Sequence, residues 1–454
     1  MVRARSNALF IVGTRPEAIK MLPLIKAFEH ASRARPVIVS TGQHAQMVAE
    51  VLALGGITPN VTFPSPVPGR SLNELFTHVL LSFDRFFRST YGEPVGPGLA
   101  SDQPEDYPGA CFVHGDTTSA AAGALAAFHL GVPVIHVEAG LRTSDTLSPF
   151  PEELNRQLIS RIAAWHLAPT SQNMANLLRE GIPAERIYVS GNTGIDALHF
   201  AASLDQPYQD PQLEDLEHPD GPRLVIVTAH RRENWGKPLA HIGTAVRTLA
   251  TMHSDVRFVL PLHPNPAVRA VLRGELEGLA NVSLVEPMGY AAFARLLKRA
   301  YVVLTDSGGI QEEAPSLGTP VLVLRKSTER QEGVDAGTLD LIGTRVEAIV
   351  AATDRLLADP EEYRRRRARV NPYGDGQASE RIRAATEHLL TGSQAPAPFG
   401  PSFDRHAVLR AAGSADGADA LLGLYRDDST SAITTTDTSP LTSVGPMAAN
   451  GDSQ

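Results

Sequence analysis

The feature that most constrains the fold is a regular alternation of short apolar runs with helical patterns. The runs of the first half of the chain are followed by turns and then by helix-forming sequence, and they lie at Ala8–Val12, Val37–Ser40, Ala110–His114, Val132–Val137, His166–Pro169 and Ile187–Ser190. Strands that alternate with helices favour a parallel sheet covered by helices on both faces. We therefore predict an α/β fold that binds its ligands at the carboxyl ends of the strands.

The alternation stops once and then resumes. Residues 201–222 are polar and acidic and contain Pro207, Pro211 and Pro219, which is typical of a connection between domains. A second series of strands is expected at Leu224–Thr228, Arg257–Leu262, Val282–Val285, Tyr301–Thr305 and Pro320–Leu324. Because single cores rarely exceed about 250–300 residues, the length of 454 residues also indicates two cores. We predict an N-terminal Rossmann-like domain over residues 1–200 and a second over residues 223–376.

The last part of the chain has a different composition. Residues 392–454 are rich in Ser, Thr, Ala, Asp, Gly and Pro. Such a segment buries too little apolar surface to offset the entropy lost on ordering, so we predict a disordered tail. One amphipathic stretch, Ala407–Tyr425, is a candidate helix, although a disordered tail is the simpler interpretation.

Charge and composition exclude several classes of function. The formal net charge of −9 argues against binding to nucleic acid. The single cysteine, Cys111, cannot form an internal disulfide. The apolar run near the N-terminus is too short for a signal peptide, and no run approaches the roughly 20 apolar residues of a membrane span. We expect a cytoplasmic protein without a membrane segment.

The strongest local signal is Asp306–Glu313, in which a predicted strand leads into Ser307, Gly308 and Gly309 and then into a helix. Small residues at a helix start expose backbone N–H groups to an anion, so a diphosphate fits here without a bound metal. Glu313 follows at a distance suited to accepting hydrogen bonds from a ribose. A purely structural Gly turn is the weaker alternative.

Three acidic residues of the first half are candidates for proton transfer: two follow predicted strands and one begins a helix. Asp116 and Glu138 each follow an apolar strand, and Glu152 begins a helix after Pro151. Carboxylates that converge on one sheet edge suit proton transfer, because each raises the pKa of the others. Simpler roles remain open, since Asp116 could cap the next helix and Glu152 could favour a helix N-terminus.

Basic residues follow other strands. Arg15 and Lys20 lie at and just after the first strand-to-helix turn, where both could point into the cleft. His230 directly follows a strand of the second half, and Arg330 follows a later one. A histidine beside arginines suits a diphosphate contact or an acid, whereas we interpret His263 as structural.

Seven motifs in one order closely resemble those of the non-hydrolysing UDP-N-acetylglucosamine 2-epimerases. They are Gly13–Lys20, Thr41–His44, His114–Thr117, His136–Arg142, Pro151–Arg156, Thr228–Asn234 and Asp306–Glu313. The resemblance implies a GT-B fold, with two Rossmann-like domains whose parallel sheets face a central cleft and a final helix, at 377–390, that crosses back to the first domain. It also implies reversible inversion at C2 of the sugar through elimination of UDP to 2-acetamidoglucal and re-addition, with no cofactor and no metal.

The resemblance assigns roles to residues of this chain. The catalytic candidates are Asp116, Glu138, Glu152 and His230. The expected UDP contacts are Arg15, Lys20, Phe293, Ser307, Gly308, Gly309, Glu313 and Arg330, with Phe293 against the uracil. Where some members have Gln, this chain has Met288. Which carboxylate removes the proton stays open.

Further expectations come from the same resemblance. Some members have an allosteric site for UDP-N-acetylglucosamine, and similar residues here are Gln43, His44, Gln46 and Arg70. The family also implies a homodimer and a product that supplies cell-surface polysaccharide. The alternatives are a GT-B glycosyltransferase, a hydrolysing epimerase and a nucleotide-sugar sensor without turnover.

Overall fold

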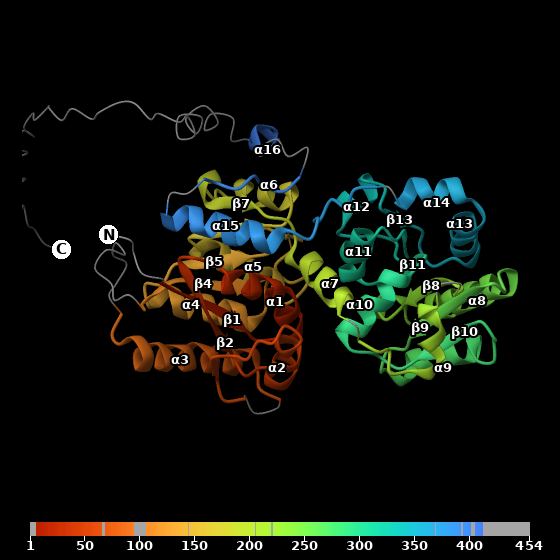
Figure 1. The fold of residues 1–454 in the computed structure, drawn as a ribbon, viewed down its shortest axis with the longest axis horizontal. Coiled ribbons are helices and arrows are strands. Elements are labelled where there is room, and N and C mark those ends of the chain that lie inside the picture. Colours follow the sequence, from red (N-terminus) through yellow and green to blue (C-terminus); the bar gives the residue numbers. More distant parts are fainter. Residues whose placement is uncertain are drawn as a thin grey trace, which may run out of the picture.

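The computed structural model describes residues 6–65, 69–94, 106–143, 145–204, 206–218, 221–367, 369–391, 394–400 and 405–411. Two sheets organise these residues, one in each half of the chain (Figure 1). Every strand pair in both sheets is parallel. The predicted α/β class with two parallel sheets is therefore confirmed.

The first sheet has seven strands in the order β3-β2-β1-β4-β5-β6-β7. Its strands are β1 (Ser6–Val12), β2 (Ala34–Ser40), β3 (Val61–Thr62), β4 (Pro108–His114), β5 (Val134–Val137), β6 (Trp165–Ala168) and β7 (Ile187–Val189). Its helices are α1 (Arg15–Glu29), α2 (Ala45–Ala53), α3 (Leu72–Tyr91), α4 (Thr118–His129), α5 (Glu152–Ile162), α6 (Ser171–Arg179) and α7 (Thr193–Ser203). The strand order reverses between β1 and β4, which is where a doubly wound sheet opens a crevice for ligand.

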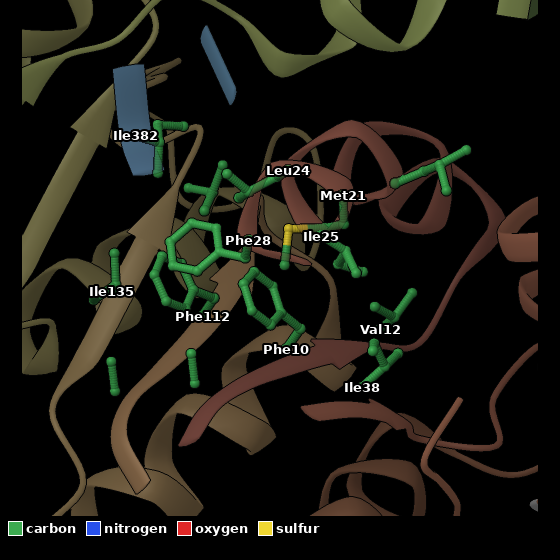
Figure 2. Packing of buried hydrophobic residues seen from close by; sticks show 14 of the residues in the cluster. Phe10, Val12, Met21, Leu24, Ile25, Phe28, Ile38, Phe112, Ile135 and Ile382 are labelled. Carbon is green, nitrogen blue, oxygen red and sulfur yellow. The ribbon is translucent and has the colours of Figure 1, made fainter. Parts of the chain in front are cut away.

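Apolar side chains cover both faces of this sheet. On one face, Phe10 and Phe112 from neighbouring strands stack with ring centroids 4.7 Å apart, and Phe28 of α1 meets both rings edge-on (Figure 2). On the other face, Phe83 and Phe87 of α3 are fully buried against α4 and the sheet. A sheet buried on both faces explains why its strands read as continuous apolar runs.

The second sheet has six strands in the order β10-β9-β8-β11-β12-β13. Its strands are β8 (Arg223–Thr228), β9 (Val256–Pro261), β10 (Val282–Val285), β11 (Val302–Thr305), β12 (Val321–Val323) and β13 (Leu339–Leu341). Its helices are α8 (Lys237–Met252), α9 (Pro266–Leu276), α10 (Tyr290–Arg299), α11 (Gly308–Glu313), α12 (Gln331–Asp335), α13 (Val346–Ala358) and α14 (Pro360–Arg367). Here the order reverses between β8 and β11, so His230 and Ser307 follow the two central strands.

The chain passes between the halves twice. The first passage includes a 3-10 helix, Pro211–Glu217, whose Leu213 and Leu216 are buried. The second leads into α15 (Ala378–Thr391), which returns to the first half and places Ile382 against the Phe10 cluster (Figures 1 and 2). Both carboxylate oxygens of Asp196 on α7 accept backbone N–H groups at the start of α15, from Ser379 at 2.7 Å and Ala378 at 3.2 Å. This helix is therefore anchored on the first half.

Part of the predicted tail is ordered. Phe399 is 7% exposed and Leu409, on α16 (Arg405–Ala411), is 2% exposed, and both join a core cluster with α6. The structure places these residues of the segment predicted to be disordered against the first half, because a few apolar side chains are enough to dock it on an existing surface. Residues 412–454 lie outside the described residues, as does most of the stretch Ala407–Tyr425 beyond α16.

Two short strands, β3 and β13, do not appear among the predicted strands. Among the described residues, no helix is long and apolar enough to cross a membrane.

Candidate functional site

The site lies where the carboxyl edges of the two sheets face one another. Glu138, after β5, and Lys20, on α1, come from the first half. Glu312 and Glu313 on α11 come from the second half and are close enough to Lys20 to raise its pKa, which burial alone would lower. A small cavity is lined by both halves, including Glu138, Asn192, Glu312 and Arg330. The structure therefore brings predicted site residues of both halves together.

Glu138 is held in a strained and charged environment. Its φ of +62° is in the left-handed region, which costs a non-glycine residue on the order of 1–3 kcal/mol. Oε1 pairs with Lys20 Nζ, and Oε2 lies 3.5 Å from His114 Nε2. Burial opposes ionisation, but Lys20 and then His114 outweigh it and lower the pKa of Glu138 to about 2. The Glu138 side chain is therefore a carboxylate at neutral pH.

Asp116 lies beside this carboxylate at the end of β4. Gly115, the residue before Asp116, lies close to the Glu138 carboxylate, because a Cβ added to it would lie 3.6 Å from Glu138 Oε2. Burial raises the pKa of Asp116, Arg156 opposes that rise and Glu138 adds to it. Thr117, not Asp116, caps α4 by accepting the Ala120 N–H at 3.0 Å. The capping alternative for Asp116 is therefore excluded.

The first turns of α5 reach the same place. Arg156 Nε donates to Asp116 Oδ2 at 2.8 Å, and Asn155 Nδ2 donates to the Asp116 carbonyl at 2.8 Å. Glu153 is fully buried and accepts from Arg156 Nη1 at 2.9 Å. Glu152 is half-buried at the first position of this helix. These bonds anchor the start of α5, which carries Glu152, to Asp116.

The turn Ser307–Gly309 carries converging positive charge. A Cβ added to Gly308 would lie 3.2 Å from Arg330 Cζ and 3.3 Å from Arg231 Nη2, so two guanidinium groups lie beside this glycine. The charge of Glu312, whose Oε1 accepts from Arg330 Nε at 2.8 Å, raises the pKa of Arg330 well above its usual range. Two arginines beside a helix start suit the binding of a doubly charged anion.

Asp306, which precedes this turn, has a structural role. It is fully buried and accepts the backbone N–H groups of His230 and Arg231, both at 2.9 Å, and Asn234 Nδ2 at 3.0 Å. These bonds bring the loop after β8 to the turn after β11. His230 Nδ1 is 3.3 Å from Asp306 Oδ1, and burial lowers the pKa of His230. His230 is therefore a neutral imidazole at neutral pH.

Two pockets adjoin the arginines. One is lined by His230, His263, Met288, Phe293 and Ile310, together with residues of β8 and the loop after β9. It presents an aromatic ring and a thioether to a flat ligand, while His263 accepts the Asn265 backbone N–H at 3.2 Å. The other pocket lies between the halves and is lined by Arg15, Met288 and Tyr290. Arg15 thus faces the second half across the cleft.

The four residues expected at an allosteric site have different neighbours in the structure. Gln43 Oε1 accepts from Ser119 Oγ at 2.7 Å, and Gln46 Nε2 donates to Glu50 at 2.9 Å. His44 is the residue before α2. Arg70 lines a surface hollow with residues of α3. Among the described residues, no hydrogen bond or ion pair joins Arg70 to the other three.

Sequence reasoning missed several residues of the site. Arg156 and Glu153 were detectable as an i, i+3 pair of opposite charges in the helix that Glu152 begins. Arg231 stands directly after His230 in the sequence. Glu17 was detectable as the third helical residue of a Thr14–Glu17 capping box at the start of α1. It is buried and accepts from Thr117 Oγ1 and from the Gly13 and Thr14 amides. It fixes the turn before Arg15 against the helix that follows Asp116.

Among the described residues, no group of three or more His, Cys, Asp or Glu side chains is arranged to hold a metal ion.

The fold and the site define the class of protein. Two parallel sheets face each other across a cleft, with an arginine-rich anion site on one side and an ionised carboxylate on the other. This is a GT-B-like α/β enzyme.

Comparison with known proteins specifies the family. The family model described as UDP-N-acetylglucosamine 2-epimerase matches residues 26–387. The UDP-N-acetylglucosamine 2-epimerase of Salmonella typhimurium is 44% identical over 380 residues, which cover 83% of this chain and 97% of that protein. This chain belongs to the UDP-N-acetylglucosamine 2-epimerase family. An epimerase is an isomerase, so the predicted enzyme class is confirmed.

Solved structures agree. The UDP-GlcNAc 2-epimerase of Neisseria meningitidis, bound to UDP-GlcNAc, has a TM-score of 0.70 and 40% identity, covering 85% of this chain and 99% of that one. An S. aureus protein in a co-structure with UDP has a TM-score of 0.73 and 40% identity, covering 87% and 100%. Both relatives are matched over nearly their whole length, whereas part of this chain has no counterpart in either match.

Glu313 provides a test of the electrostatics of the cleft. Burial raises the pKa of Glu313 to about 7, Glu312 and Glu138 add to the rise, and Lys20 opposes it. Between pH 4.5 and 7 the folded chain therefore holds a proton that the unfolded chain has lost, and stability falls as pH rises through this window. Glu313→Gln removes the cost of ionisation, so we expect its melting temperature to exceed that of the wild type by about 2–4 °C at pH 8.

This difference should shrink towards pH 5, as differential scanning calorimetry would show. Glu277→Gln, at an exposed position on the same half, is the matched control and should follow the wild type at every pH. A difference between Glu313→Gln and wild type that stays constant from pH 5 to 8 would contradict the proposed environment of Glu313.

Proposed function

We propose that this chain interconverts UDP-N-acetylglucosamine and UDP-N-acetylmannosamine by inverting C2 of the sugar. The observation that carries this proposal is the arrangement across the cleft. The ionised Glu138 and the less acidic Asp116 lie on one edge, and Arg231 and Arg330 converge on Gly308 at the other. A sugar whose diphosphate binds the arginines would extend towards the carboxyl groups.

The reaction we propose has two halves. A carboxylate takes the proton from C2, the C2 electron pair forms the C1=C2 double bond, and the C1–O bond breaks with its electron pair moving to the diphosphate. The products are 2-acetamidoglucal and UDP. In the second half a UDP oxygen forms a bond to C1 while a proton is delivered to the opposite face of C2. The arginines stabilise the charge that develops on the diphosphate.

Inversion requires two proton-transfer groups, because the proton leaves one face of C2 and arrives on the other. Glu138 and Asp116 suit these roles, since their environments move their pKa values in opposite directions. In the reverse reaction the two groups exchange roles. Glu152, on the anchored start of α5, and His230, beside the arginines, complete the proposed catalytic set.

For UDP we propose contacts from both halves of the chain. Phe293 packs on the uracil and Glu313 accepts hydrogen bonds from the ribose. The diphosphate binds in the cleft, at the Ser307–Gly309 turn. The diphosphate contacts are Arg15, Lys20, Ser307, Gly308, Gly309 and Arg330. Holding UDP in this way keeps the leaving group in place while the glycal waits for re-addition.

The test is solvent exchange at C2. Purified protein incubated with UDP-N-acetylglucosamine in deuterium oxide should yield the manno epimer, with deuterium at C2 of both sugars by NMR and mass spectrometry. Absence of both deuterium at C2 and the manno epimer would refute the proposal. Sugar transfer that depends on an added acceptor would instead support a GT-B glycosyltransferase, and free N-acetylmannosamine would indicate a hydrolysing enzyme.

Four finer expectations belong to the same proposal. The enzyme acts in the cytoplasm as a homodimer, and its product is a precursor of cell-surface polysaccharide. Substrate acts as an activator through Gln43, His44, Gln46 and Arg70. Initial rates that follow a hyperbola in substrate, without sigmoidicity, would contradict the last of these.

A further inference from the structure

The ordered segment after α15 lies beyond the family match, which ends at residue 387. Residues 394–400 pass along β7, the last strand of the first sheet. The Phe399 N–H donates to the Val189 carbonyl at 2.9 Å, and Tyr188 Oη donates to the Ala397 carbonyl at 2.9 Å. The segment therefore satisfies backbone and side-chain groups along the edge strand.

The segment is fixed at both ends. Arg381 of α15 stacks over the Phe399 ring, with Cζ 5.5 Å from its centroid. Further on, Leu409 of α16 is buried against α6, and Arg405 Nη2 donates to the Ala184 carbonyl at 2.6 Å. Because the buried Phe399 and Leu409 contribute apolar area, this docking is more than a surface contact.

Phe399 touches the turn that leads to the interdomain contact. Its Cγ lies 3.5 Å from the ideal Cβ position of Gly191, whose φ is +87°. The next residue, Asn192, begins α7 and donates from Nδ2 to Glu312 Oε2 at 2.8 Å. The other carboxylate oxygen of Glu312 holds Arg330, as described above. One line of contacts thus joins Phe399 to Arg330 through Gly191, Asn192 and Glu312.

We propose that residues 394–400, docked together with α16, form a brace that positions Arg330 for the diphosphate. Phe399 packs against the Gly191 turn, the turn orients Asn192, and Asn192 fixes the carboxylate that orients Arg330. Phe399 is therefore a positioning residue for nucleotide binding. This inference rests on the proposed function, because it takes Arg330 as a diphosphate ligand.

The test compares single and double variants of the full-length chain by titration calorimetry with UDP. Phe399→Ala and Asn192→Ala should each weaken UDP binding about tenfold, and the double variant should also be about tenfold weaker, because both changes break one line of contacts. KM should rise while kcat changes less than twofold, since the brace acts on binding rather than on proton transfer. Phe399→Leu should restore most of the affinity.

Controls separate this role from a structural one. Leu389→Ala removes an apolar side chain from an exposed position on α15 and should leave UDP affinity unchanged. Tyr188→Phe removes the hydroxyl that donates to the Ala397 and Pro396 carbonyls. It provides a mild perturbation if Phe399→Ala unfolds, with UDP binding about two- to threefold weaker.

Two results would overturn the brace. One is a lower melting temperature for Phe399→Ala with unchanged UDP affinity. The other is a double variant that binds UDP about a hundredfold more weakly than the wild type. A wild type that fails to bind UDP would instead refute the proposed function.

Discussion

Replacing Glu138 with glutamine should lower kcat for epimerisation by about a thousandfold, within the range expected for loss of a proton-transfer group. Gln keeps the size of the side chain and has the same difficulty as Glu in adopting a φ of +62°. The main change is therefore loss of the charge that pairs with Lys20 and lies 3.5 Å from His114. UDP binding should change less than threefold.

The measurement separates two steps. Deuterium incorporation at C2 reports proton removal, and formation of the manno epimer reports the complete cycle. Both should fall together if Glu138 acts in every turnover. Glu277→Gln, the exposed control, should match the wild type. If Glu138→Gln keeps activity within tenfold of the wild type, Glu138 is not a proton-transfer group.

Replacing Arg330 with alanine should weaken UDP binding by about a hundredfold, the loss expected when a buried partner of a charged group is removed. The guanidinium groups of Arg330 and Arg231 both lie beside Gly308, and Arg330 is held there by Glu312 and Glu329. Arg330→Lys keeps the charge but not the planar fork, and should be about tenfold weaker than wild type.

Part of the loss in Arg330→Ala comes from Glu312. Without Arg330 this carboxylate is left unpaired beside the incoming diphosphate. Adding Glu312→Gln to Arg330→Ala should therefore recover some of the affinity. Arg273→Ala, at a half-exposed position on α9, is the matched control. UDP affinity within threefold of wild type for Arg330→Ala would contradict the proposed diphosphate site.

The sequence predicts the fold well because the buried parallel strands carry a strong signal. Val282–Val285 was predicted with its observed bounds, and Phe10 and Phe112 lie in runs that no solvent-exposed strand would tolerate. The docking of Phe399 could not be predicted, because one aromatic side chain in a stretch rich in Ala and Pro has no periodicity. Its position depends on a groove that only the folded first half creates.

Parts of the site that come from one chain segment could be predicted from the sequence. Parts that form where two distant segments meet could not. Ser307–Gly309 can be identified as an anion site from a strand, small residues and a helix. The contact of Asn192 with Glu312 joins residues 120 positions apart, so no local pattern indicates it. The pKa shifts of Asp116 and Glu138 likewise arise only in the fold, because burial raises the pKa of Asp116 whereas Lys20, from another helix, lowers that of Glu138.

The backbone at Glu138 has an evolutionary consequence. Glycine, and to a lesser degree asparagine, adopts a positive φ at lower cost than glutamate, so either would relax the chain here. Glutamate at this position lowers the stability of the fold and is retained only while its carboxylate is under selection. A descendant of this chain that has lost turnover should therefore drift towards Gly or Asn at position 138. The identity of that single residue would distinguish a working enzyme from a protein that has kept only its shape.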